Sequence, residues 1–206
     1  MISPALDDFV NKHRGNDISS ERKKVLDQLT HHISHKVKNS EPINLNFICT
    51  HNSRRSHLSQ IMAQTMASHF KIGNVNCYSG GTEATAVYPM VIETLRKIGF
   101  SVQQLSYGDN PIYAIKFAAS EHPVIAFSKK FEDGFNPKKG FAAVMTCSHA
   151  DENCPMVFGA DERISITYND PKAFDNSPLQ AEKYLECAEL IANEMHYVFQ
   201  KVEQAG

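Results

Sequence analysis

One segment of the sequence combines a cysteine, an arginine and a serine in a pattern that suits catalysis. Five residues separate the cysteine from the arginine, and the serine follows the arginine directly. The segment runs Cys49, Thr50, His51, Asn52, Ser53, Arg54, Arg55, Ser56. Between a strand and a helix, the backbone N–H groups of such a loop point inward and bind an anion together with the helix N-terminus. The guanidinium of Arg55 can bind two oxygens of a tetrahedral oxyanion. This pattern predicts an oxyanion-binding loop over Thr50 to Ser56.

Cys49 is the candidate nucleophile of this loop. The inward N–H groups, the helix N-terminus and Arg55 all favour its thiolate form near neutral pH, and Ser56 can donate a hydrogen bond to that thiolate. The simpler alternative is a buried cysteine that ends a core strand, with two solvated arginines beside it. The coincidence of spacing, strand–loop–helix context and the hydroxyl after Arg55 favours the functional interpretation.

A second pair of thiols lies farther along the chain. Six residues separate Cys147 from Cys154, and Pro155 follows directly. The spacing is too wide for a zinc knuckle and there is no second pair to complete a tetrahedral site, so we expect neither a metal nor another cofactor. On spacing alone, two unrelated cysteines at a strand end and in a loop are favoured. Cys77 and Cys187 are assigned to packing.

The elements that must position these residues alternate between strands and helices from residue 43 onward. Apolar runs predict strands over 43–48, 75–78, 123–127, 141–146 and 163–168, with helices over about 58–70, 89–98 and from 177. This alternation predicts an α/β fold in three layers, with a central, mainly parallel sheet of about four core strands and helices on both faces. We divide the chain into a helical N-terminal extension (1–42) and a catalytic domain (43–206). An insertion over about 108–140 is expected to form a strand or hairpin near the mouth of the site.

Composition excludes several classes of protein. The 206 residues carry 21 Lys and Arg against 23 Asp and Glu, a formal net charge of −2, which disfavours a nucleic-acid partner. No apolar run approaches the length needed to span a membrane, and the N-terminus lacks the layout of a signal peptide. Five cysteines in a chain of this length do not form a disulfide framework. We therefore expect a cytoplasmic protein without a membrane partner.

Residues 49–56 resemble the phosphate loop of the low-molecular-weight tyrosine phosphatase superfamily, which includes the thioredoxin-coupled arsenate reductases. The resemblance runs from about Leu45 to Val202 and includes Tyr78-Ser79-Gly80-Gly81-Thr82, Val87-Tyr88-Pro89 and Asn169-Asp170-Pro171. It implies that Asp170 is the general acid and that Asn52, Ser56 and Ser79 support the loop, with Ser79 as the expected partner of Asn52. The sequence departs from the superfamily's phosphate loop at two positions. His51 stands where Gly is usual, and Arg54 stands where Cys is common. A left-handed backbone at His51 would cost about 1 kcal/mol.

The second thiol pair separates the branches of this superfamily. Its arsenate reductases carry two cysteines with this separation followed by Pro, whereas its phosphatases typically carry tyrosines directly after the Asp-Pro pair. Lys172-Ala173-Phe174 stands there instead. The resemblance therefore implies reduction of arsenate to arsenite, in which Cys49, Cys147 and Cys154 act in turn and thioredoxin is the reductant. The alternatives are a phosphatase that hydrolyses phosphotyrosine or a small phosphate ester through Cys49, Arg55 and Asp170, and a non-catalytic oxyanion-binding module.

Overall fold

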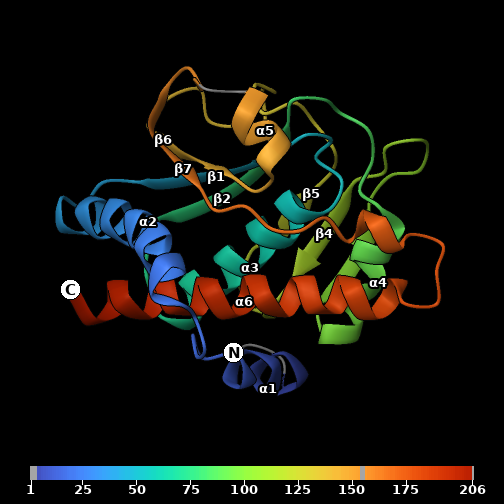
Figure 1. Ribbon diagram of the computed structural model, residues 1–206, viewed down its shortest axis with the longest axis horizontal. Helices are drawn as coiled ribbons and strands as arrows, with labels where there is room; N and C mark the ends of the chain where they lie inside the picture. The colour runs from blue at the N-terminus through green and yellow to red at the C-terminus, as the bar shows by residue number, and fades with distance from the viewer. Residues whose placement is uncertain (1–3, 154–155, 206) are drawn as a thin grey trace.

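The computed structural model describes residues 4–153 and 156–205. Its main sheet contains four strands, β1 (Ile43–Cys49), β2 (Val75–Gly81), β6 (Phe141–Met145) and β7 (Ala160–Ser165), in the order β2-β1-β6-β7. All neighbouring strands are parallel (Figure 1). The predicted α/β fold with a parallel sheet of four core strands is confirmed. Because the strands are parallel, their carboxyl ends lie at one edge, where ligands bind in such folds.

Most helices lie against one face of this sheet. They include α3 (Arg55–His69) and the long α6 (Gln180–Ala205), with α4 (Pro89–Ile98) beside α6. The opposite face carries only the six-residue helix α5 (Ser148–Asn153) together with loops, as Figure 1 shows. The buried residues accordingly form a large cluster on the first face and a small one beneath α5. Cys49 belongs to the small cluster, so the candidate nucleophile lies on the thinly covered side.

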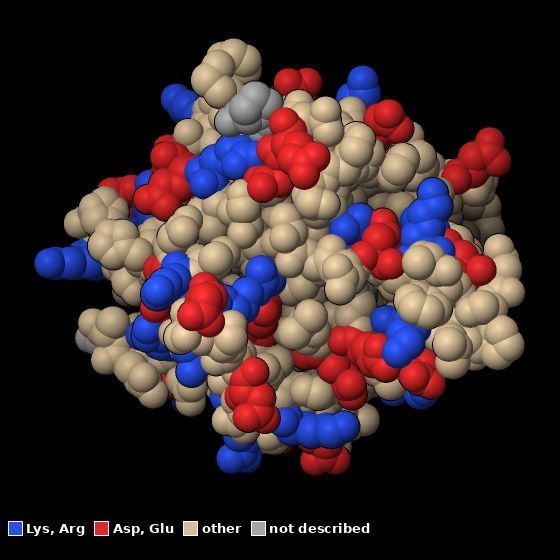
Figure 2. Space-filling view, in the orientation of Figure 1, with Lys and Arg blue, Asp and Glu red and all other residues tan. Residues whose placement is uncertain are grey.

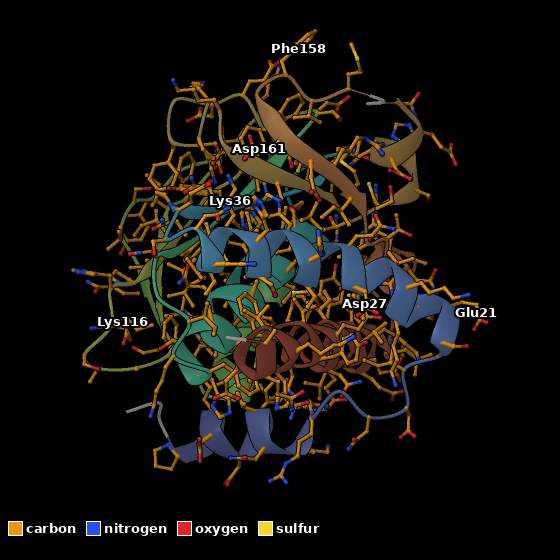
Figure 3. The ribbon with its side chains drawn as sticks, turned by 90° about the vertical axis from the view of Figure 1, so that its left-hand side faces the viewer. Glu21, Asp27, Lys36, Lys116, Phe158 and Asp161 are labelled. Atoms are coloured by element: carbon orange, nitrogen blue, oxygen red, sulfur yellow. The ribbon has the colours of Figure 1, made fainter. Side chains whose placement is uncertain are left out.

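The N-terminal segment forms two helices, α1 (Pro4–Lys12) and α2 (Ser20–Lys38), which pack against the same core. The side chain of Ser19 caps α2 by accepting a hydrogen bond from the Arg22 N–H. Two ion pairs hold α2: Lys36 Nζ lies 2.9 Å from Asp161 Oδ2 at the start of β7, and Asp27 Oδ1 lies 2.8 Å from Lys201 Nζ on α6. Figure 3 labels Lys36, Asp161 and Asp27. The helical extension is therefore tied to both the sheet and the last helix.

Three further strands form a separate antiparallel sheet in the order β3-β4-β5. They are β3 (Ser101–Gln104), β4 (Tyr113–Lys116) and β5 (Val124–Ala126). The pattern of apolar residues predicted only β5, since β3 is four residues long and largely exposed. The expected inserted hairpin corresponds to β4 and β5, and it belongs to this second sheet rather than to the parallel one.

Among the described residues, the outer edge of β2 has no partner strand in the main sheet apart from a single bridge between Gly81 and Lys130, but side chains bond its backbone. Gln64 accepts from the Cys77 N–H and donates to the Val75 carbonyl, while Gln60 donates to the Cys77 carbonyl. Nearer the carboxyl end, Asn136 donates to the Ser79 carbonyl. Helix α3 and the segment after β5 thus satisfy an edge that is otherwise open.

Charged side chains are distributed without a strong bias of sign on the face in Figure 2, where Lys and Arg alternate with Asp and Glu. None of the helices within the described residues is long and apolar enough to span a bilayer. The surface in this view therefore gives no sign of the extended basic patch typical of nucleic-acid binding.

Candidate active site

The Cys49 loop (residues 49–56) connects the carboxyl end of β1 to α3, which begins at Arg55. Each backbone carbonyl from residue 49 to 54 accepts a hydrogen bond. The donors are, in chain order, Thr82 N, Glu83 N, Ser128 Oγ, His57 Nε2, Tyr88 N and Leu58 N, at 2.8 to 3.1 Å. In the described part of the chain, no acceptor meets the backbone N–H groups of residues 50–54. The carbonyls are bonded outside the loop, and the N–H groups are left for an anion.

Asn52 holds the loop in shape from within. It has a left-handed backbone with φ of 45°, and its side chain is fully buried. Its amide donates to Ser56 Oγ at 2.9 Å, and its side-chain carbonyl accepts from the Lys129 N–H at 2.9 Å. Since Ser56 Oγ accepts from Asn52, its proton is available to Cys49 Sγ, 3.1 Å away. A chain of hydrogen bonds therefore leads from Asn52 through Ser56 to the sulfur of Cys49.

Ser79 supports the loop through an intermediate side chain that the sequence did not indicate. His57 is fully buried, and its Nε2 donates to the Asn52 carbonyl at 2.9 Å. The other ring nitrogen, Nδ1, must then accept from the Ser79 hydroxyl at 3.2 Å. Burial lowers the pKa of His57 to about 3, so the imidazole is neutral and this tautomer is fixed. The expected direct bond between Asn52 and Ser79 is replaced by this bridge.

The segment after β5 reaches the loop from its outer side. Ser128 binds the His51 carbonyl, and the Lys129 backbone binds Asn52. The Lys129 side chain is buried over the rings of Phe127 and Phe135, and this burial lowers its pKa to about 8. Gly81 is required beside these contacts, because a Cβ there would lie 2.7 Å from the Asn52 nitrogen. The insertion therefore supports the back of the loop.

Arg55 and Asp170 lie together at the carboxyl edge of the sheet. Arg55 Nη2 donates to Asp170 Oδ2 at 2.5 Å, and its Nη1 donates to the Tyr168 carbonyl at 2.8 Å. Asp170 also caps the short helix η1 (Pro171–Phe174) by accepting from the Lys172 N–H at 3.0 Å. The carboxylate of Asp170, the candidate acid, thus already binds the guanidinium of Arg55. An oxyanion in the loop would have to replace this carboxylate on at least one guanidinium nitrogen.

Cys147 follows the end of β6 and lies next to the Cys49 loop. Its sulfur is 3.5 Å from Thr50 Oγ1 and accepts from the Ala150 N–H at 3.3 Å. It is 1% exposed and packs in the same small apolar cluster as Cys49. Cys154, the other member of the predicted pair, lies outside the described residues. Cys77 and Cys187 are buried and burial raises both pKa values, that of Cys187 to about 12, in keeping with packing roles.

The comparisons with known proteins agree with this geometry. Residues 44–122 match the profile of the family described as low molecular weight phosphotyrosine protein phosphatase. This match covers rather more than a third of the chain and includes the Cys49 loop. No curated protein sequence matches it.

Solved structures of this superfamily resemble the chain at the level of the fold. A low molecular weight phosphotyrosine phosphatase from Vibrio cholerae O395 is 13% identical, with a TM-score of 0.50 over 74% of this chain and 91% of that one. A YwlE mutant from Bacillus subtilis is 12% identical, with a TM-score of 0.51 over 77% and 97%. An arsenate reductase in a phosphate-binding state is 14% identical, with a TM-score of 0.50 over 77% and 98%. Both kinds of enzyme therefore share this fold.

The two departures from the superfamily's usual loop do not disturb the backbone at their own positions. His51 does not have a positive φ, so the expected strain at this residue is absent, and the left-handed residue is its neighbour Asn52. Arg54 is held away from the loop by Asp175 at 2.5 Å, donates to Tyr184 Oη and stacks on the ring of Tyr88. Arg54 therefore brings a paired charge to the mouth of the site rather than a free one.

Proposed function

We propose that the protein reduces arsenate to arsenite through a thiol–disulfide cascade of Cys49, Cys147 and Cys154 that thioredoxin recycles. The observation that supports this most is the place of Cys147. Its sulfur touches the side chain of Thr50, the residue next to Cys49, and both sulfurs share one small apolar cluster. A phosphatase would need no second thiol at this point, whereas reduction requires one.

In the first step Cys49 attacks the arsenic of an arsenate bound by the loop N–H groups and Arg55. Asp170 protonates the oxygen that leaves as water. Cys147 then attacks Cys49: the sulfur–sulfur bond forms, the sulfur–arsenic bond breaks and arsenic keeps its electron pair, going from the +5 to the +3 state. Cys154 next attacks Cys147, which frees Cys49 and leaves a disulfide for the reductant.

We expect the second exchange to require α5 to unwind. Its six residues, Ser148 to Asn153, separate Cys147 from Cys154 in the sequence and rise about 9 Å along the helix axis. A disulfide holds its two Cα atoms roughly 4.4 to 6.8 Å apart, so an intact helix between the two cysteines opposes the bond. We therefore expect α5 to be helical in the reduced protein and not in the oxidised one.

A reductant must reach this disulfide from outside, and the surface there is apolar. Met156 is 68% exposed and Phe158 is 84% exposed, two and four residues beyond Cys154 in the sequence. Figure 3 shows Phe158 at the outer end of the molecule, pointing away from the core. Exposed apolar side chains beside a reactive thiol suit a transient protein contact, and this supports thioredoxin as the partner.

Hydrolysis of a phosphate ester is the second candidate, supported by a different observation. Cys49 is bonded to Ser56 and Arg55 is bonded to Asp170, and these four residues suffice for a cysteinyl-phosphate mechanism. Phosphotyrosine and small aryl phosphates are the substrates of this alternative. A protein that binds the oxyanion without turnover would show neither activity.

One paired assay tests the proposal. Arsenate-dependent oxidation of reduced thioredoxin and hydrolysis of an aryl phosphate are measured on the same preparation, with a Cys49→Ser variant as the blank for both. We expect thioredoxin oxidation in proportion to arsenite formed. If the wild type hydrolyses the ester and oxidises no thioredoxin, the phosphatase alternative replaces the proposal.

A further inference from the structure

A histidine on α5 is linked to the Cys147 sulfur through one hydroxyl group. His149 Nδ1 lies 3.2 Å from Thr50 Oγ1, and the same oxygen lies 3.5 Å from Cys147 Sγ. His149 is exposed, whereas Cys147 is buried. A hydroxyl can accept one hydrogen bond and donate another, so Thr50 can connect the buried thiol to a base at the surface.

We propose that His149 takes the proton of Cys147 through Thr50 and so prepares Cys147 for its attack on Cys49. This inference rests on the proposed reductase function, in which Cys147 must become a thiolate. His149 touches neither the sulfur nor the substrate, so it is a positioning residue. Cys147 and Thr50 alone provide a hydrogen bond but no base, and the imidazole of His149 supplies one.

The proton balance of the step is simple. With its ring proton on Nε2, His149 accepts at Nδ1 from the Thr50 hydroxyl, which accepts from the Cys147 S–H. The thiol proton moves to Thr50 Oγ1 as the hydroxyl proton moves to Nδ1. One proton has then left the sulfur, the imidazolium carries it, and the hydroxyl donates to the thiolate. No electrons move until the thiolate attacks Cys49.

Two ionisable neighbours of this pair, Asp151 and His51, have other partners. Asp151, on the same helix, accepts from Arg163 at 2.6 Å and from Ser165 on β7. His51, next to Thr50, lies 3.6 Å from Glu83. Glu152 is exposed on α5. Within the described residues, Thr50 is the side chain to which the His149 ring is hydrogen-bonded, so the thiol proton has a defined destination.

The test measures Cys147 reactivity without arsenate, so that it does not depend on the reductase function. In a chain carrying Cys49→Ser and Cys154→Ser, Cys147 alkylation by iodoacetamide is followed by mass spectrometry from weakly acid to alkaline pH. Cys77 and Cys187 stay unreactive because burial raises their pKa values. We expect His149→Ala to slow alkylation at neutral pH about tenfold, with the difference vanishing at alkaline pH, where the thiol ionises unaided.

Three further variants separate a proton-transfer role from a structural one. Free imidazole should restore the rate of the His149→Ala chain. Thr50→Val should cause the same loss and make His149→Ala without further effect, since His149 acts through Thr50. Glu152→Ala, which removes another exposed α5 side chain, should leave the rate within about twofold. An unchanged pH profile in His149→Ala, or a loss that imidazole does not restore, overturns the proposal.

A second arm uses arsenate. In the Cys154→Ser chain, formation of the Cys49–Cys147 disulfide after arsenate is added should also slow about tenfold when His149 is replaced by Ala. If alkylation slows and disulfide formation does not, His149 has no part in the reaction and the proposal is wrong. If no disulfide forms in any chain, the reductase function fails, whereas the alkylation result still decides the link between His149 and Cys147.

Discussion

The two segments that carry the sulfurs are built in opposite ways. In the Cys49 loop, every backbone carbonyl from residue 49 to 54 accepts a hydrogen bond, and the donors come from the end of β2, the start of α4, the start of α3 and the segment after β5. Helix α5, which follows Cys147, has six residues, of which Ala150 is buried and Ser148, His149, Glu152 and Asn153 are exposed. A nucleophile that binds an anion needs a fixed backbone. A thiol that passes electrons onward needs a segment that can move.

Removing a sulfur from the second segment should have the largest effect and should separate the two halves of the chemistry. We expect Cys147→Ser to abolish arsenate-dependent thioredoxin oxidation and to spare aryl phosphate hydrolysis, because hydrolysis needs only Cys49, Arg55 and an acid. Cys154→Ser should release a single arsenite and trap a Cys49–Cys147 disulfide, detectable by mass spectrometry. Cys77→Ser is the matched control, since this buried thiol lies on β2 away from the cascade. If both variants leave arsenate reduction intact, the contrast between the two segments has no functional meaning.

Asp170→Asn should give the next largest effect, on the side of the fixed loop. The rate of the acid-dependent step should fall roughly a hundredfold, because the amide cannot donate the proton. Oxyanion binding should become tighter, since Arg55 loses the carboxylate that holds its Nη2 at 2.5 Å. Phosphate affinity by calorimetry and turnover should be measured on the same variant. An unchanged rate would assign proton transfer to another group, and weaker binding would show that Asp170 itself shapes the loop.

Substitutions at Asn52 measure how firmly the loop is fixed. Asn52→Ala removes bonds to Ser56 and to the Lys129 N–H and keeps the left-handed backbone, so it should lower the free energy of unfolding by about 2 kcal/mol. Asn52→Gly also loses these bonds, but it adopts a φ of 45° without strain and should recover about 1 kcal/mol. Urea unfolding of the three proteins makes the comparison. Equal stability of the Ala and Gly variants would mean that the loop relaxes and is not rigid.

The buried imidazole beneath the loop should make the stability of the fold depend on pH. The pKa of His57 is lowered to about 3, below its ordinary value of 6.5. Between these two values the unfolded chain binds a proton that the folded chain does not, so stability should fall as pH falls, by roughly 1 kcal/mol per pH unit. His57→Gln should reduce this slope between pH 6.5 and about 3.

The control for this titration is His196, whose pKa burial lowers to about 4. His196→Gln should also reduce the dependence of stability on pH. It should leave phosphate binding unchanged, because His196 lies on α6 and is not hydrogen-bonded to the Cys49 loop, whereas His57 is. Urea unfolding at several pH values measures both slopes. A wild-type slope that His57→Gln leaves unchanged would contradict the neutral, buried imidazole.

The sequence was most informative where one pattern served both packing and chemistry. The run that ends at Cys49 predicts a buried strand, and the residues after it predict the loop, so the position of Cys49 at the end of β1 followed directly. The support of Ser79 was expected, but its route through His57 was not, because a histidine within a helix carries no sign of its burial. Lys129 was missed for a similar reason: its backbone N–H, not its side-chain type, binds Asn52.

The strand at the edge of the parallel sheet and the strands outside it show where the sequence was less informative. β7 was expected over 163–168 and extends over Ala160–Ser165, because its first residues are polar and half exposed at the edge of the sheet. β3 and β4 are each four residues long, and each is stabilised by hydrogen bonds to the other. The apolar residues of one short segment do not predict such a pairing. Local patterns thus predict strands that are buried on both faces better than those that depend on a partner.

The glutamine contacts on β2 bear on how this chain behaves beside other copies of itself. A parallel sheet ordinarily ends in a row of unpaired peptide groups that a strand from another chain can join. Here Gln60 and Gln64 already occupy the Val75 and Cys77 peptide groups, and Asn136 that of Ser79. An incoming strand would have to break these bonds before making its own, so sheet-to-sheet assembly and the aggregation that begins with it are disfavoured at this edge.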